Sequence, residues 1–375
     1  VLDAPGQVEL FDFYYRGDAA RYPLPTARPP DERATDASLA ALAGRHPRVW
    51  LLLWADREAD PAGLVERWLD EQMYRTSSRW WGGVRAVLYV NPRVADVEPQ
   101  RLPVGARFGE LGELAAVEVV GLGARAGEAL PVTLEWRAGA ASQARYTAFV
   151  HLIDDEEYLW GQHDAEPAGG ARPTTSWRAG ETIADRHGLP VAVGTPPGRY
   201  RLEVGLYRAD TGARLPVAGG GDRVLVGPLD VQAGRADQAP PIGRPTDALF
   251  GSARLAGSDL HPLGRDEAPA ELARGELALL TLWWRAADRA DEPPTDLLLG
   301  LSRAGAAVRE RRLTLTGGRY PAERWETGQW VRDPHKLATD DLEPGRYALT
   351  LRARDAAGRR LGPGGGVSLG ELVVR

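Results

Sequence analysis

The residues with the richest potential chemistry lie between His151 and Asp164, where imidazoles and carboxylates gather. Such groups bind transition metals, and the acidic run 154–157 offers the clustered oxygens that calcium takes. The run lacks the spacing of a known calcium loop, and the alternative interpretation, which we favour, is a solvated acidic turn that joins two strands. No metal is therefore expected. The weaker candidates for metal ligands are His151, Asp154, His163 and Asp164.

Sugar binding is a second chemistry to consider, because the face of an aromatic ring matches the apolar face of a pyranose. The stretch 176–189 recurs as 324–337, so that Trp177, Asp185 and His187 have the counterparts Trp325, Asp333 and His335. These tryptophans would either stack on sugars or close the open end of a β-domain while the Asp and His bond a turn. Retention in both copies favours the scaffold interpretation. The candidate carbohydrate-binding residues are Trp160, His163, Asp164, Trp177, Trp325 and Trp330.

Several chemistries are excluded by composition and motif. The chain has no cysteine, which removes disulfides, thiolate metal sites and thiol nucleophiles. It has no Gly-x-Ser-x-Gly, His-Glu-x-x-His or phosphate-loop motif. The formal net charge of −6 argues against a nucleic-acid partner, which needs concentrated positive charge. We therefore expect no catalytic residue and no cofactor in this chain.

The elements that must position these residues follow from the internal repeat. Residues 176–189 match 324–337 at an offset of 148, the Pro-Gly-Arg-Tyr segments follow at 147, and the match extends over most of 108–232 and 247–375. Each half reads as short strands separated by turn signals, without helical periods between them. This pattern predicts two tandem immunoglobulin-like antiparallel β-sandwiches, with a linker over 91–107 before the first and another over 233–246 before the second.

Residues 1–92 show a different pattern, in which strands alternate with helices. Helices are expected over 5–15, 31–44 and 60–73, and strands over 48–54 and 84–90. The pattern predicts a small three-layer α/β domain with a largely parallel sheet. The domain also holds a dense tryptophan set, of which Trp50 and Trp54 are expected in the core. The rest of the set would face either the core or a neighbour such as a membrane surface; they are Trp68, Trp80 and Trp81.

The order of these parts resembles a known family. The segments that carry the resemblance are 14–18, 48–54, 80–85, 149–154, 162–164, 173–181 and 196–207. Together they resemble the soluble C-terminal region of bacterial multi-pass membrane glycosyltransferases of the mannosyltransferase-like class, family 39. The resemblance covers 1–232 directly and the rest through the repeat. It implies that the catalytic acid and the polyprenyl-phosphate sugar donor belong to a transmembrane part.

The resemblance implies a location on the outer face of the cytoplasmic membrane and an accessory role. We expect a non-catalytic region that positions or recognises a glycan or protein acceptor and is tethered by a membrane-embedded part of the same polypeptide. Two alternatives stay open: a structural or protein-interaction module without sugar affinity, and an independent glycoside hydrolase. The chain starts at Val1 rather than Met, which suggests a fragment. Scarce Asn, Met and Cys fit a thermophile or a GC-rich genome.

Overall fold

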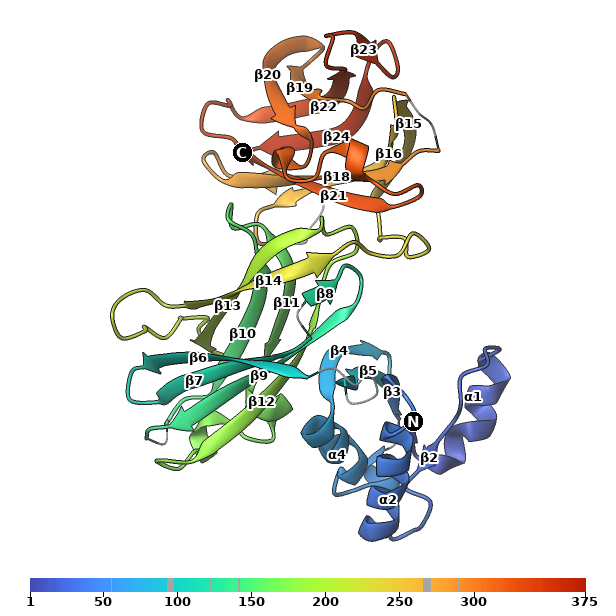
Figure 1. The fold of residues 1–375 in the computed structure, drawn as a ribbon, viewed down its shortest axis with the longest axis vertical. Coiled ribbons are helices and arrows are strands. Elements are labelled where there is room, and N and C mark those ends of the chain that lie inside the picture. The colour runs from blue at the N-terminus through green and yellow to red at the C-terminus, as the bar shows by residue number, and fades with distance from the viewer. Residues whose placement is uncertain (55, 93–97, 122, 141, 266–270, 289–290) are drawn as a thin grey trace. The chain divides into compact units, whose positions relative to one another are not determined.

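A computed structural model describes residues 1–54, 56–92, 98–121, 123–140, 142–265, 271–288 and 291–375. The chain is mostly β, with several sheets (Figure 1). It divides into two compact units, which are treated separately below. The first holds most of residues 1–230, and the second holds most of the remainder. No helix among the described residues is long and apolar enough to cross a membrane.

The N-terminal sheet is mixed rather than largely parallel. Its strand order is β2-β1-β3-β5-β4, in which β1 pairs in parallel with β2 and β3, whereas β3–β5 and β5–β4 are antiparallel. The prediction missed β4, which a two-residue Gly82-Gly83 connection joins to β5, and so short a connection permits only an antiparallel pair. The strands are β1 (Leu2–Asp3), β2 (Pro23–Leu24), β3 (Arg48–Leu53), β4 (Tyr74–Trp81) and β5 (Val84–Val90).

Helices cover one face of this sheet. Leu39 and Leu42 of α2 and Val65 and Leu69 of α4 pack with the sheet residues Val49, Leu51, Val87 and Tyr89 in one core. The helix α1 has no buried residue. The opposite face of β3 carries Trp50, which is 51% exposed and lines a hollow together with Phe11 of α1, so the expected third layer covers this face only in part. The helices are η1 (Pro5–Gln7), α1 (Val8–Tyr14), α2 (Glu32–Ala43), α3 (Asp56–Ala59) and α4 (Leu64–Gln72).

Two sheets follow in the first unit. One has the order β11-β10-β13-β14-β8 and the other β12-β9-β7-β6. Most residues of the central strands β9, β10 and β13 are buried, in runs rather than in strict alternation, as expected for strands that have a shared core on one face and are also covered on the other. The strand β6 already begins at Pro99, inside the segment predicted as linker. The strands are β6 (Pro99–Phe108), β7 (Gly112–Val120), β8 (Gly123–Arg125), β9 (Ala129–Ala138), β10 (Tyr146–Ile153), β11 (Leu159–Ala165), β12 (Thr182–Pro190), β13 (Gly198–Arg208) and β14 (Val224–Gln232). Short 3-10 turns lie at η3 (Pro167–Gly170) and η4 (Thr174–Ser176).

The second unit contains another pair of sheets around one core. Their orders are β15-β16-β18-β21 and β17-β24-β22-β19-β20, with β23 added to β22. Leu280, Leu282 and Trp284 of one sheet meet Leu299 and Leu349 of the other in a single cluster. The strands are β15 (Arg244–Phe250), β16 (Ala253–Pro262), β17 (Glu271–Leu272), β18 (Leu277–Ala286), β19 (Asp296–Arg303), β20 (Ala306–Thr314), β21 (Trp330–Ala338), β22 (Gly345–Arg354), β23 (Arg360–Leu361) and β24 (Val367–Val374). The 3-10 turns are η5 (Leu315–Gly318) and η6 (Ala322–Arg324).

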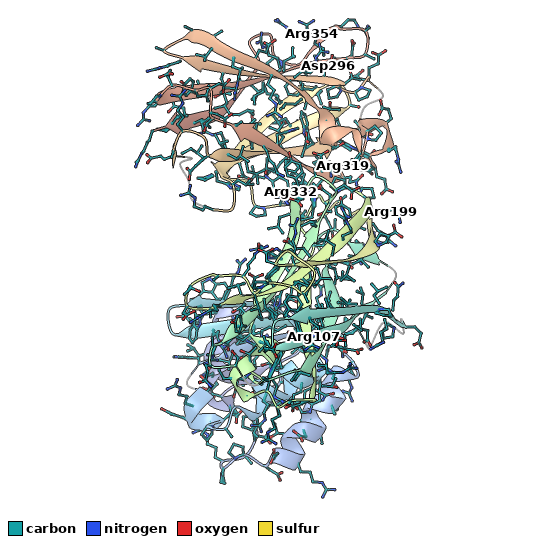
Figure 2. The ribbon with its side chains drawn as sticks, turned by 90° about the vertical axis from the view of Figure 1, so that its left-hand side faces the viewer. Arg107, Arg199, Asp296, Arg319, Arg332 and Arg354 are labelled. Atoms are coloured by element: carbon teal, nitrogen blue, oxygen red, sulfur yellow. The ribbon has the colours of Figure 1, made fainter. Side chains whose placement is uncertain are left out.

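The register of the second unit is antiparallel along its central strands. Asp296 at the start of β19 lies opposite Arg354 at the end of β22, and both are labelled in Figure 2. Along β19, every second side chain points into the core, which buries Leu297, Leu299 and Leu301.

Candidate functional site

His151 lies at the centre of a polar network on the outer face of β10. Neighbouring strands supply its partners: its Nδ1 lies 3.2 Å from Glu203 Oε2 on β13, and its Nε2 lies 3.2 Å from Asp164 Oδ1 on β11. His151 and Glu203 are direct register partners, so the sheet itself brings them together. Sequence reasoning singled out His151 and Asp164 but missed Glu203, because a single Glu in a strand carries no signal.

Opposite charges are paired throughout this network. Burial alone lowers the pKa of His151, but the hydrogen bonds to Asp164 and Glu203 outweigh it and raise the pKa to about 9. Burial raises the pKa of Glu203, but bonds from His151 and Arg223 lower it to about 2. Arg223 and Arg214 lie 3.0 and 3.3 Å from Glu203. An imidazolium held by two carboxylates has no free lone pair, so it can act neither as a general base nor as a metal ligand.

The network holds a long segment over the sheet. Arg214 and Arg223 belong to residues 209–223, which return over β13 after it ends, and Leu215 N donates to Leu206 O at 2.8 Å. The Arg214 guanidinium also lies 4.4 Å from the centre of the Phe149 ring, a cation–π contact. The arrangement therefore closes this face of the sheet rather than opening it to a substrate.

The other two metal candidates lie elsewhere. Asp154 is buried and closes the turn between β10 and β11, where its carboxylate accepts from the backbone N of Glu156 and Tyr158 at 2.9 and 3.0 Å. His163 turns to the other side of β11 and meets His187, with Nδ1 to Nδ1 at 2.9 Å. Within the described ranges, no three His, Asp or Glu side chains gather as metal ligands. Residues 154–157 form the turn between β10 and β11, but Asp154 is buried in it rather than solvated.

The repeated Asp bonds a turn in both copies, and the repeated His lies beside it. Asp185 accepts from the Trp136 indole at 3.3 Å and from Ala168 N at 2.9 Å, and lies 3.0 Å from His187 Nε2. Ala168 has φ of 52°, a strained left-handed conformation that this bond helps to hold. In the second copy, Asp333 accepts from the Trp284 indole at 3.2 Å and from Thr316 N at 3.0 Å, and His335 lies beside the Asp333 carboxylate. The scaffold interpretation therefore holds for Asp185 and Asp333, whereas His187 and His335 contact these carboxylates rather than the turn.

Two of the four predicted sugar platforms are closed off. Trp160 and Trp177 are 0% and 1% exposed, and their indoles donate to Asp154 Oδ2 at 2.6 Å and to Arg172 O at 2.9 Å. A ring without an exposed face cannot stack on a sugar, so these two predictions are wrong. Alternation could not have indicated the burial of Trp160, because it lies at a register shift between β10 and β11, and Gln162 and Asp164, two and four positions further on, are exposed.

Trp325 and Trp330 are half-buried and keep part of each ring accessible. Trp325 lines a hollow of about 490 Å³, and its indole donates to Tyr320 O at 3.0 Å, which orients the ring. The polar groups around this hollow are carboxylates and hydroxyls: Ser252, Asp288, Asp291, Glu323 and Thr327. Arg285 lies 5.5 Å above the ring of Trp330. Of the predicted platforms, Trp325 therefore keeps the surroundings that a sugar would need.

Exposed aromatic side chains gather in the N-terminal domain. Trp50 and Trp54 are 51% and 40% exposed, which contradicts their predicted place in the core. The strand β3 alternates, and Val49, Leu51 and Leu53 take the helix-covered face, so Trp50 must point to the other face. We define the exposed aromatic set as Phe13, Tyr14, Trp50, Trp54, Trp80 and Trp81; among the described residues it includes every exposed large aromatic side chain. Trp68 packs against the core instead.

Comparison with known proteins adds little to this geometry. No protein-family model matches the chain, and no curated protein matches it. A crystal structure of a DUF4785 family protein from Legionella pneumophila shares 10% sequence identity over 78% of the chain, with a TM-score of 0.20. The chain spans 63% of the length of that protein. So low a TM-score supports no argument about fold or function.

Proposed function

We propose that this chain is a non-catalytic accessory region of a bacterial membrane glycosyltransferase of the mannosyltransferase-like class, acting on the outer face of the cytoplasmic membrane. In this proposal, the N-terminal α/β domain contacts the membrane or the membrane-embedded part of the same polypeptide. The two pairs of sheets act as immunoglobulin-like sandwiches that position or recognise a glycan or protein acceptor.

The observation that carries the proposal is the exposed aromatic set. Tryptophan and tyrosine have an apolar body and a polar tip, and both are enriched where proteins meet the boundary between lipid and water. Exposed apolar surface of this kind often marks a contact with a protein or a membrane. Trp80 is 66% exposed and carries the Arg85 guanidinium 5.7 Å from its ring centre, so one residue pair combines an apolar and a cationic group.

The acceptor part of the proposal rests on the hollow beside Trp325. An oriented half-exposed ring with carboxylates and hydroxyls at its rim matches the apolar face and the hydroxyl groups of a sugar. Glycan-array binding that is lost in Trp325→Ala would support this part. The alternative, a structural or protein-interaction module, is favoured by the burial of Trp160 and Trp177, and predicts no glycan binding at all.

An independent hydrolase lacks support. In the His151 network, Asp164 and Glu203 are both held by the same imidazolium. Glu203 is also bound to two arginines, so it is not free to act as a general acid or base in a reaction.

Vesicle flotation tests the proposal directly. The chain should float with phosphatidylcholine vesicles, and a variant with Trp50, Trp54 and Trp81 replaced by Ser should lose most of that binding. The control is Leu225→Ser, which removes an exposed apolar side chain from β14 and should float like the parent. If the parent chain stays in the unbound fraction, or if the triple variant binds equally well, the membrane role is wrong.

A further inference from the structure

Two acidic residues meet the carboxyl end of the parallel part of the N-terminal sheet. Asp3 ends β1, and Asp60 follows β3 through the short helix α3. β1 lies between its parallel neighbours β2 and β3, so the chain leaves it toward one side and later returns on the other. In open α/β sheets, ligands bind beyond the carboxyl ends of strands at such a point of reversal.

Both carboxyl groups are buried and incompletely bonded. Asp3 and Asp60 are 1% and 3% exposed. Asp60 Oδ2 accepts from Val65 N at 2.9 Å at the start of α4, which leaves its Oδ1 free. Within the described part of the chain, Oδ1 of Asp60 and Oδ1 of Asp3 have no hydrogen-bond partner. Buried carboxylate oxygens are costly unless a donor, a cation or a proton compensates them.

The electrostatic surroundings of Asp3 are acidic. The carboxylates of Asp60, Asp56 and Glu66 act on Asp3. Arg85 opposes them, but its guanidinium is ion-paired with Glu66. The backbone directly after Asp3 is also strained: Ala4 has φ of 142° although it is not glycine. Strain of this kind persists where the surroundings hold it, and it occurs often at ligand sites.

We propose that Asp3 and Asp60 bind a hard divalent cation of the Mg²⁺ type at the carboxyl end of β1. Carboxylate oxygens are the protein ligands that Mg²⁺ takes, and Mg²⁺ typically keeps several waters and uses one or two carboxylates. That demand fits this pair, which supplies two buried carboxylates. Ca²⁺ is a poorer match, since it takes six to eight oxygens. Asp56 is half-buried and completes the acidic surroundings from the start of α3.

Titration with Mn²⁺, followed by electron paramagnetic resonance of the free ion, tests the site, with Mg²⁺ as competitor. We expect one saturable site per chain. Asp3→Asn and Asp60→Asn should each weaken it by more than about tenfold, because each removes a direct ligand. Asp36→Asn, which removes an exposed carboxylate from α2, should leave the affinity unchanged. Absence of a saturable site, or retention of it in both ligand variants, overturns the proposal.

Thermal unfolding supplies a second readout. Millimolar MgCl₂ should raise the unfolding temperature of the parent chain above its value in EDTA, but should not raise that of Asp60→Asn. If Asp3→Asn does not fold, Asp60→Asn still carries the test, since an amide oxygen can accept from Val65 N. A pair that instead shares a proton would give no response to Mg²⁺ in either chain, and the cation site would be wrong.

Discussion

At the scale of single residues, His151 shows how a residue that suggests catalysis serves the fold. Its two ring nitrogens face Glu203 and Asp164, both at 3.2 Å, and its side chain is 15% exposed. The folded pKa of about 9 lies above the ordinary value of 6.5. The native state therefore binds the proton more tightly than the unfolded chain does. Stability from this proton is present in full below pH 6.5 and is lost as pH rises through 9.

Replacement of His151 by Gln should remove this dependence on pH. The free energy of unfolding of the first unit should fall by up to about 3 kcal/mol at pH 6, and by far less at pH 10, where the parent has lost the proton as well. Urea unfolding at a series of pH values measures the effect. Gln162→Ala, which shortens an exposed uncharged side chain on β11, should keep the parent's slope. An equal loss at pH 6 and pH 10 would contradict the ionic account.

At the scale of elements, the two copies differ in what covers one sheet. In the first copy, Gly205 of β13 lies beneath the Phe149 ring and the returning segment 209–223. In the second copy, Gly300 of β19 borders an open hollow of about 350 Å³. The outer face of the sheet is therefore covered in the first copy and open in the second. The two copies share the strands but differ in the segments that connect them.

The glycines at these two positions should respond differently to a methyl group. A Cβ on Gly205 would lie 2.3 Å from the Phe149 ring and 2.9 Å from Asp222 O, whereas a Cβ on Gly300 would meet nothing closer than 3.6 Å. Gly205→Ala should lower the free energy of unfolding by about 1–3 kcal/mol through overpacking, and Gly300→Ala should change it by less than about 0.5 kcal/mol. Chemical denaturation of both variants measures the difference. Similar losses would mean that the covering segment is not tightly packed.

At the scale of the whole molecule, the net charge and the exposed aromatic set predict different interactions with a lipid bilayer. The formal net charge is −6, so the chain as a whole is not drawn to anionic lipid. Any attraction to a bilayer must come from the exposed aromatic set, which draws on α1, β3 and β4. Interfacial burial of aromatic rings depends little on ionic strength, unlike attraction between charges.

Membrane binding should therefore resist salt. Flotation with neutral vesicles should be as strong at about 0.5 M salt as at low salt, because screening acts only on charges. Vesicles that contain phosphatidylserine should bind no better than neutral ones. A strong preference for anionic vesicles that disappears in salt would show that arginines, rather than tryptophans, make the contact.

Much of the architecture could be predicted from the sequence alone. The 148-residue offset indicated the repeat, and the apolar alternation placed most strands, because both depend on local patterns. The turn role of Asp185 and Asp333 followed from their presence in both copies. The same reasoning failed for Trp50 and Trp54, since a continuous apolar run does not reveal that one face of the sheet is covered only in part.

Tertiary structure decided which side chains meet. Glu203 reaches His151 because β13 pairs with β10 in one particular register, although 52 residues separate them in the chain. Trp136 reaches Asp185 in the same way across β9 and β12. Asp3 and Asp60 share one end of a sheet because β1 and β3 run in parallel. Local sequence carries no record of such pairings, which depend on strand order, register and the closure of a shared core.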